Sequence, residues 1–293
     1  MNTLLKNLTI KNNFMFAAVM SDEENCKGFL ERALSMKIDR VEINTEKNIV
    51  YHPEYKGVRL DVYAKDENNT RYNIEMQVLK QPALGRRSRY YQSQMDMELL
   101  AKGCEYAELP DSYVIFLCDF DPFGEGKYRY TFWTTCEETE KVSLKDGRCI
   151  MFLNTHGKNP EDVPKELVSF LKFVHADLKE SQKDFQDDYV RQVQKPVTDI
   201  KASREMEERF MLLEELLKDE HRQGVQEGIQ KGIQKGELKA TREILEMTLV
   251  KFGQLPDDFL KTLHEQQDTG IIKSWIQTAL TVQSLDEFIS KIC

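Results

Sequence analysis

Val58-Arg59-Leu60-Asp61-Val62-Tyr63 and Tyr72-Asn73-Ile74-Glu75-Met76-Gln77-Val78 are two runs in which apolar and polar side chains alternate. The segment between them contains Asp66-Glu67-Asn68-Asn69-Thr70, which consists of turn-forming residues. Alternating runs on either side of a short polar loop predict a β-hairpin. In a regular strand, Leu60 and Val62 share one face and the polar residues between the apolar ones share the other.

The phase of the two strands predicts an acid pair. If Lys65 pairs with Arg71 across the five-residue loop, the antiparallel register places Asp61 opposite Glu75, with Cβ atoms roughly 4.5–5.5 Å apart. Like charges in that position destabilise a sheet unless a cation lies between them. Mg²⁺ is such a cation, since one or two carboxylates commonly hold it. The competing interpretation is that both acids lie on a solvated surface.

The spacing of Asp61 and Glu75-Met76-Gln77 resembles the PD-(D/E)xK nuclease core, with Gln in place of Lys. Over roughly residues 1–180, the sequence also resembles the Rpn family of bacterial recombination-promoting nucleases, which are also described as transposases. The segments that carry this second resemblance are Lys11-Asn12-Asn13-Phe14-Met15-Phe16, Arg59-Leu60-Asp61-Val62, Asn73-Ile74-Glu75-Met76-Gln77, Arg89-Tyr90-Tyr91-Gln92-Ser93 and Phe116-Leu117-Cys118-Asp119-Phe120-Asp121-Pro122-Phe123.

The resemblance implies a fold and an activity. The fold would be a restriction-endonuclease-like α/β domain, a mixed sheet flanked by helices. The activity would be hydrolysis of DNA phosphodiester bonds with Mg²⁺ or Mn²⁺, linked to recombination or mobile elements. Asp61 and Glu75 would hold the metal together with the backbone carbonyl of Met76.

Gln77 and Arg59 are the further catalytic candidates. The Lys of the parent motif orients the nucleophile and neutralises charge, whereas Gln is neutral and only exchanges hydrogen bonds. Gln77 is therefore expected to position a water molecule. Arg59 lies opposite Gln77 in the predicted register and could supply the missing positive charge. Alternatively, it forms a simple ion pair with Asp61 or Glu75.

An arginine cluster follows the second strand. Arg86, Arg87 and Arg89 lie in a predicted helix, and the guanidinium fork suits phosphate. The family resemblance places this helix beside the active site, so the three arginines are candidate DNA contacts. A solvated face is the alternative. Asn13 and Ala17 depart from the family, whose members often carry an acid and a lysine there.

Composition limits the class of protein. The net charge is −9 in 293 residues, which is unusual for a nucleic-acid enzyme because cationic contacts to phosphate supply most non-specific affinity. A local basic patch would be needed. The six cysteines are scattered without a C-x-x-C pair, which predicts a reducing cytoplasm rather than disulfides. No signal-peptide pattern or membrane-spanning apolar run occurs in the sequence.

The chain is predicted to divide in two. Residues 1–178 read as the nuclease-like α/β domain, with helical residues 12–36 and further strands over 113–118, 128–134 and 149–153. Residues 179–202 are rich in charged side chains and are predicted to form a linker. Pro196 is expected to interrupt regular structure before the next helix. An α-helical region over 203–293 would follow.

A four-residue repeat lies inside the predicted C-terminal helix. Glycine recurs at 224, 228, 232 and 236, and a helix-interior glycine costs roughly 1 kcal/mol relative to alanine. One interpretation is a helix-pairing face for homo-oligomerisation, with Val225, Ile229 and Ile233 beside the glycines. The other is a partly frayed spacer.

Other motifs are weak. Asp119 and Asp121 follow a predicted central strand and read as a turn beside Pro122 rather than as metal ligands. The five histidines are isolated in sequence, so a zinc site is not expected, and the glycine repeat lacks the G-K-[ST] of a phosphate loop.

Three functions therefore remain open from sequence. The first is a metal-dependent DNA endonuclease. The second is a catalytically inactive nuclease fold that acts as a DNA-binding or assembly module. The third is an interaction module in the C-terminal helices.

Overall fold

The computed structural model describes residues 4–49, 58–139 and 141–292, and only the backbone of residues 45–49 and 58–59. The chain forms two compact units, which divide between Phe210 and Met211. Within the described residues, a six-stranded sheet is the centre of the first unit. Its strands are β1 (Val41–Ile49), β2 (Val58–Asp66), β3 (Arg71–Gln77), β4 (Ser112–Cys118), β5 (Arg129–Phe132) and β6 (Arg148–Asn154).

The sheet mixes antiparallel and parallel pairing in the order β1-β2-β3-β4-β6-β5. β1, β2 and β3 pair antiparallel, β3, β4 and β6 pair parallel, and β5 is antiparallel to β6. Parallel strands need a crossover, and α3 (Leu84–Leu99) lies in the one between β3 and β4. The restriction-endonuclease-like mixed sheet with flanking helices is confirmed.

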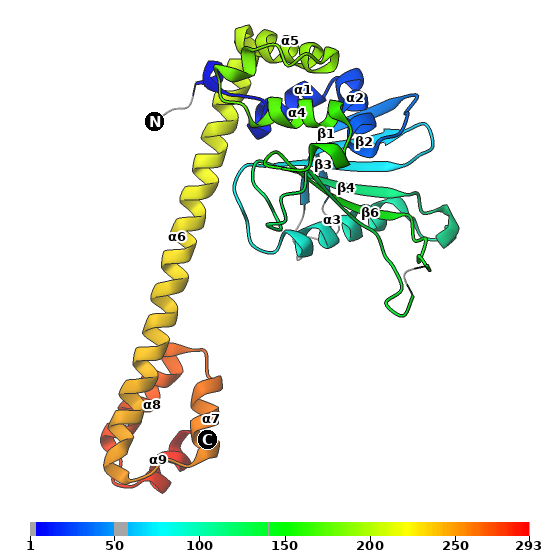
Figure 1. Ribbon diagram of the computed structural model, residues 1–293. Coiled ribbons are helices and arrows are strands. Elements are labelled where there is room, and N and C mark those ends of the chain that lie inside the picture. The colour runs from blue at the N-terminus through cyan, green and yellow to red at the C-terminus, as the bar shows by residue number, and fades with distance from the viewer. Residues whose placement is uncertain (1–3, 50–57, 140, 293) are drawn as a thin grey trace. The chain divides into compact units, whose positions relative to one another are not determined.

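Helices cover both faces of the sheet (Figure 1). α3 lies on one face. The opposite face is covered by α1 (Asn13–Met20), α2 (Glu23–Leu34) and α4 (Lys165–His175), and α5 (Asp188–Ala202) packs on the outer side of these helices. Short 3₁₀ turns connect the elements at η1 (Leu5–Asn7), η2 (Tyr106–Glu108), η3 (Pro160–Asp162) and η4 (Glu180–Gln182).

β4 is buried on both sides, as its unbroken apolar run predicts. Ile115 and Leu117 join the core beneath α1, α2, α4 and α5. Val114 and Phe116 join a second core with Met95 of α3. β4, which pairs with β3, therefore lies between the helical layers on the two faces of the sheet.

The segment 179–202, expected to be a charged linker, is folded instead. It contains η4 and α5, and Tyr189, Val190 and Val193 of α5 are buried in the core. Pro196 lies inside α5 and does not break it, and the break comes at Ser203. Burial of the apolar face of α5 offsets the roughly 3 kcal/mol that an interior proline costs.

The second unit is helical, as predicted. α6 (Arg204–Leu249) enters it and is followed by η5 (Val250–Phe252), α7 (Asp257–Glu265), α8 (Thr269–Thr281) and α9 (Leu285–Ile292). Its own small core includes Leu245, Leu263, Ile272 and Phe288. Among the described residues, no helix combines the length and apolar character needed to cross a membrane.

Candidate active site

β2 and β3 pair in the predicted register. Lys65 is the Cα partner of Arg71, and the ladder continues from there toward the open end of the hairpin. The ladder ends at the pair Val62–Ile74, and Asp61 and Glu75 are the next residues beyond that pair. The backbone N–H of Asp61 donates to Oε1 of Glu75 at 3.4 Å, so the two acids are neighbours.

The alternation of β2 is broken at Asp61. Val62 packs in the core beneath α1 and α2, whereas Leu60 packs with Tyr63 in the core on the α3 face. The prediction that Leu60 and Val62 share a face is wrong. Side chains of a regular strand alternate strictly, so the backbone departs from regular geometry where the first acid stands.

Asp61 and the Met76 backbone converge on one point. Oδ2 of half-buried Asp61 accepts the backbone N–H of Met76 at 3.1 Å. Nδ2 of Asn13 lies 3.4 Å from that carboxylate oxygen and 3.4 Å from the Met76 carbonyl oxygen. Asn13 reaches this point because Asn12 caps α1, accepting the N–H of Phe14 at 3.0 Å. Two predicted metal-ligand oxygens, Oδ2 of Asp61 and the carbonyl oxygen of Met76, therefore both lie 3.4 Å from the Asn13 side-chain nitrogen.

Glu75 is fully buried, with 0% of its surface exposed. Its Oε2 accepts a hydrogen bond from Nη2 of Arg87 at 2.9 Å. Burial and the neighbouring charge of Asp61 raise the pKa of Glu75 to about 8, and the Arg87 guanidinium opposes this rise. A buried acid that repels a second acid is a site where a divalent cation replaces lost solvation, so the residues present fit a metal ion.

Arg87 connects the acid pair to Gln77. Its Nη1 donates to Oε1 of buried Gln77 at 3.2 Å and to Oε1 of Gln81 at 3.3 Å, and its Nε donates to the Tyr91 hydroxyl at 2.7 Å. The guanidinium carbon lies 4.9 Å from the centre of the Tyr91 ring. A positive charge therefore stands beside the neutral residue that replaces the motif lysine.

The other predicted basic residues differ in placement. Arg86 and Arg89 are exposed on α3, while half-buried Arg87 turns inward to the acids. The side chain of Arg59 lies outside the described residues, and only its backbone is placed, opposite Asn48 of β1. In the sequence, nothing distinguishes Arg87 from Arg86 and Arg89, because its inward orientation depends on how α3 packs against the sheet.

Asp121 forms the predicted turn, but Asp119 does not. The Asp121 carboxylate accepts the backbone N–H groups of Phe123, Gly124 and Gly126 at 2.7–3.1 Å. Burial acts to raise its pKa, but these bonds outweigh burial and the pKa of Asp121 is lowered. Asp119 instead meets two histidines that sequence reasoning judged isolated, His156 and His175.

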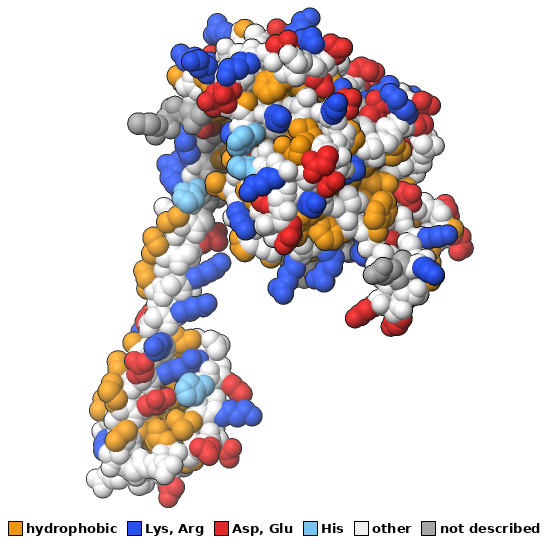
Figure 2. All heavy atoms as spheres, in the orientation of Figure 1, with side chains coloured by type: hydrophobic (Ala, Val, Ile, Leu, Met, Phe, Trp, Pro, Cys, Tyr) orange, Lys and Arg blue, Asp and Glu red, His pale blue; other side chains and the backbone are white. Residues whose placement is uncertain are grey.

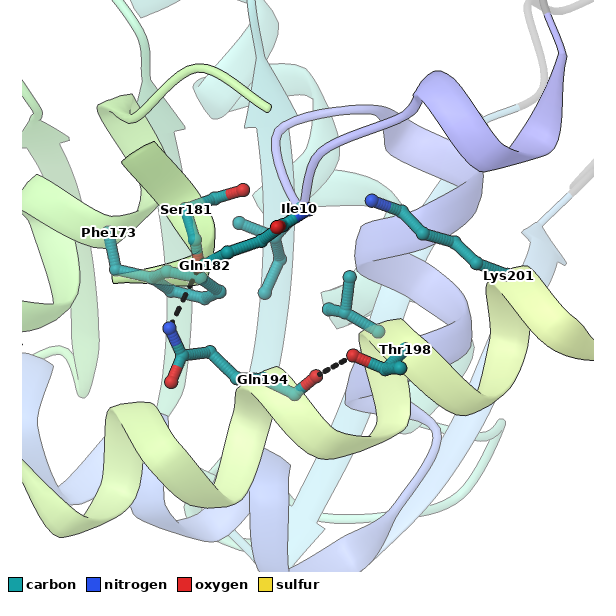
Figure 3. Close-up of a pocket in the computed structure, with 8 residues that line it drawn as sticks. Ile10, Phe173, Ser181, Gln182, Gln194, Thr198 and Lys201 are labelled. Atoms are coloured by element: carbon teal, nitrogen blue, oxygen red, sulfur yellow. Dashed lines mark hydrogen bonds between the residues drawn. The ribbon is translucent and has the colours of Figure 1, made fainter. Parts of the chain in front are cut away.

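A separate pocket lies between α5 and the segment around η4 (Figure 3). Its lining residues are Ile10, Phe173, Ser181, Gln182, Gln194, Val197, Thr198 and Lys201. Gln194 spans it, with its Nε2 donating to the Ser181 carbonyl at 2.8 Å. Asp61 and Glu75 do not line this pocket.

A mixed sheet that carries an acid on β2 and a Glu-Met-Gln tripeptide on β3 between helical layers defines a protein of the PD-(D/E)xK nuclease class. The sequence model for the PD-(D/E)XK nuclease family transposases matches residues 10–241, and the chain belongs to this family. The match runs through α5 and most of α6. No curated protein and no solved structure matches the chain.

Proposed function

We propose that this protein is a Mg²⁺- or Mn²⁺-dependent DNA endonuclease that acts in recombination or in the movement of mobile elements. The observation that supports this best is the convergence of Asp61, Glu75 and the Met76 carbonyl at the open end of the hairpin. Family membership adds the nuclease class.

Asp61, Glu75 and the Met76 carbonyl would hold the cation. When bound, it would polarise the scissile phosphate and lower the pKa of a water molecule. The Glu75 carboxylate needs help to stay ionised because burial raises its pKa to about 8. Arg87 provides part of that help through its 2.9 Å ion pair.

Gln77 and Arg87 would share the role of the motif lysine. Gln77 supplies hydrogen bonds that can orient the attacking water, and Arg87 supplies the positive charge beside it. Oε1 of Gln77 accepts from Nη1 of Arg87, which leaves the Gln77 amide N–H₂ group as a donor. Arg59 remains a further candidate for this charge.

DNA contact is proposed for the arginines of α3. Arg86 and Arg89 are exposed on α3, which follows β3 in the sequence, so they would contact the phosphate backbone. Arg87 would lie closer to the scissile bond. Figure 2 shows Lys and Arg side chains interspersed with Asp and Glu over the visible face. Local basic groups would have to outweigh the net charge of −9.

Homo-oligomerisation through the C-terminal helices would supply a second active site for cutting the second strand. On α6, Val225, Ile229 and Ile233 are 46%, 57% and 64% exposed. Cβ atoms added at Gly224, Gly228, Gly232 and Gly236 would meet nothing within 4 Å, so a second helix has room to approach.

Free cysteines such as Cys26 and Cys118 are consistent with a cytoplasmic protein.

Cleavage of supercoiled plasmid tests the proposal. The purified full chain should nick or linearise the plasmid with Mg²⁺ or Mn²⁺ and stop when EDTA is added. Glu75→Ala should be inactive, and Glu42→Gln, at a partly exposed acid of β1 paired with Lys65, should cleave like the parent chain.

Absence of cleavage by folded protein under either metal would refute the endonuclease. If that protein still shifted duplex DNA in a gel, the alternative of a catalytically inactive DNA-binding module would stand. The neutral Gln77 is the observation that favours this alternative.

A further inference from the structure

Three side chains from three separate elements meet beyond the ends of β4 and β6. Asp119 follows β4, His156 follows β6 by two residues, and His175 is the last residue of α4. One ligand atom from each lies within 4.8 Å of the others. Nδ1 of His175 is 2.8 Å and Nε2 of His156 is 3.6 Å from the same oxygen, Oδ1 of Asp119.

The fold holds this cluster in place. The backbone N–H of Asp119 donates to the Gln77 carbonyl at 2.9 Å, which fixes it against the end of β3. The Thr155 hydroxyl donates to Oδ1 of Asp119 at 2.8 Å. The backbone N–H of His156 donates to Oδ1 of Asn154 at 2.8 Å. The ligand atoms therefore stand on strand ends and a helix end rather than on a long loop.

An ion pair alone explains this arrangement poorly. One protonated imidazole would suffice for one carboxylate, yet two imidazole rings lie with centroids 4.4 Å apart at 70°. Two imidazolium ions at that separation would repel each other. Two imidazole nitrogens and one carboxylate oxygen that lie within 4.8 Å of one another form a typical donor set for a borderline transition metal.

We propose that Asp119, His156 and His175 bind a divalent transition metal ion, with Zn²⁺ as the best match to the donors. Three protein ligands leave a fourth position open for water or a phosphate oxygen. This site is distinct from the acid pair in chemistry, because imidazole nitrogens select zinc-like ions whereas Asp61 and Glu75 offer the hard oxygens that suit Mg²⁺.

Lys11 defines how the carboxylate binds. Its Nζ lies 3.0 Å from Oδ2 of Asp119, whereas both histidines lie near Oδ1, so Asp119 would bind through Oδ1 alone. The ammonium of Lys11 also opposes a second cation nearby, so Lys11→Gln should tighten metal binding.

Calorimetric titration of Zn²⁺ into the metal-stripped full chain tests the site, with excess Mg²⁺ present to occupy the acid pair. The parent chain should bind one equivalent through this cluster. His156→Ala and His175→Ala should each weaken that binding by at least about tenfold. The matched control is His264→Ala, because His264 lies 3.6 Å from Glu246 as a single histidine–acid pair. It should bind like the parent.

The Co²⁺-loaded chain should show visible ligand-field bands without a thiolate charge-transfer band, since cysteines take no part. Equal Zn²⁺ binding by the parent chain and both histidine variants, or no binding by any of them, would overturn the proposal. Circular dichroism in EDTA checks folding. The His156 side chain is 44% exposed, and His156→Gln provides a second, milder variant.

The outcome is independent of nuclease activity. Failure of plasmid cleavage leaves the zinc titration unchanged, and failure of the zinc titration leaves the acid pair intact. The two proposals therefore fail separately.

Discussion

In the β2–β3 hairpin, the charged Glu75 is completely buried, whereas on α6 the apolar Ile229 and Ile233 are 57% and 64% exposed. Each arrangement is unfavourable for an isolated chain, since burying charge and exposing apolar surface both cost free energy. In the hairpin, Arg87 offsets part of the cost. On α6, nothing in the described chain covers the two isoleucines. The comparison agrees with the two proposals, that the acid pair binds a cation and that α6 binds another surface.

Glycines show the same contrast. A Cβ at Gly28 of α2 would lie 2.4 Å from Cε2 of Tyr189, so that glycine is required by packing. A Cβ at Gly228 would meet nothing within 4 Å. In the first unit, glycine lets helices touch within the chain, while on α6 it leaves space that the chain itself does not fill.

The largest effect is expected for Asp61→Ala. Loss of a metal ligand should reduce plasmid cleavage by about a thousandfold, because metal ions supply several kcal/mol of transition-state stabilisation. Circular dichroism should show an unchanged fold, since Asp61 is only half-buried. Full cleavage by this variant would remove the hairpin from the mechanism.

The double variant Gly228→Leu and Gly232→Leu should convert an oligomer to a monomer. Two bulky side chains would fill the space that a partner helix needs. Light scattering on the full chain measures the mass directly. An unchanged mass would show that these glycines form no contact.

Arg87→Ala should lower the free energy of unfolding of the first unit by about 1–3 kcal/mol, because Oε2 of the buried Glu75 would lose the hydrogen bond from Arg87. Arg86→Ala is the matched control, one residue away and exposed, and should change stability by no more than about 0.5 kcal/mol. Thermal unfolding in EDTA compares the two. Equal stabilities would argue that Arg87 contributes charge to catalysis alone.

Gly28→Ala should destabilise the α2–α5 contact by about 1–3 kcal/mol through overpacking. The Tyr189 ring cannot easily give way, since its hydroxyl donates to the Asn25 carbonyl at 2.5 Å and Arg32 lies 4.0 Å from its centre. Hydrogen exchange in α2 and α5 should accelerate. Gly85→Ala, where a Cβ has nothing within 4 Å, serves as the control and should not do this.

The smallest effect is expected for Gly228→Ala. Alanine should stabilise α6 locally by roughly 1 kcal/mol relative to glycine, which slows hydrogen exchange in residues 224–236 by about fivefold. A faster exchange would mean that the methyl group disturbs a partner helix, and would support the pairing interpretation of the repeat.

Local patterns predicted the hairpin well because they act over a few residues. Alternation and a five-residue loop define the Lys65–Arg71 register and hence the neighbouring acids. The same alternation failed at Leu60, where the strand departs from the regular repeat at Asp61. Periodicity describes regular strands and contains no information about a local distortion.

Local sequence patterns could not predict which residues from distant segments of the chain contact one another. Asp119, His156 and His175 lie on three elements that only the folded sheet and α4 bring together. Arg87 was predicted to contact DNA, but its turn toward Glu75 depends on how α3 packs on β4. The prediction of a linker over residues 179–202 was wrong because it relied on charge density. Only a few residues of α5, namely Tyr189, Val190 and Val193, form its buried face.

The hydrogen bond between Gln77 and Arg87 limits which side chains position 77 can accept. A lysine at position 77 would place an ammonium group against a guanidinium that now lies 3.2 Å from the Gln77 side chain. The single substitution Gln77→Lys is therefore expected to be unfavourable while Arg87 remains. Substitutions at the two positions are therefore expected to be non-additive, with Gln77→Lys better tolerated when Arg87 is also replaced by a neutral residue.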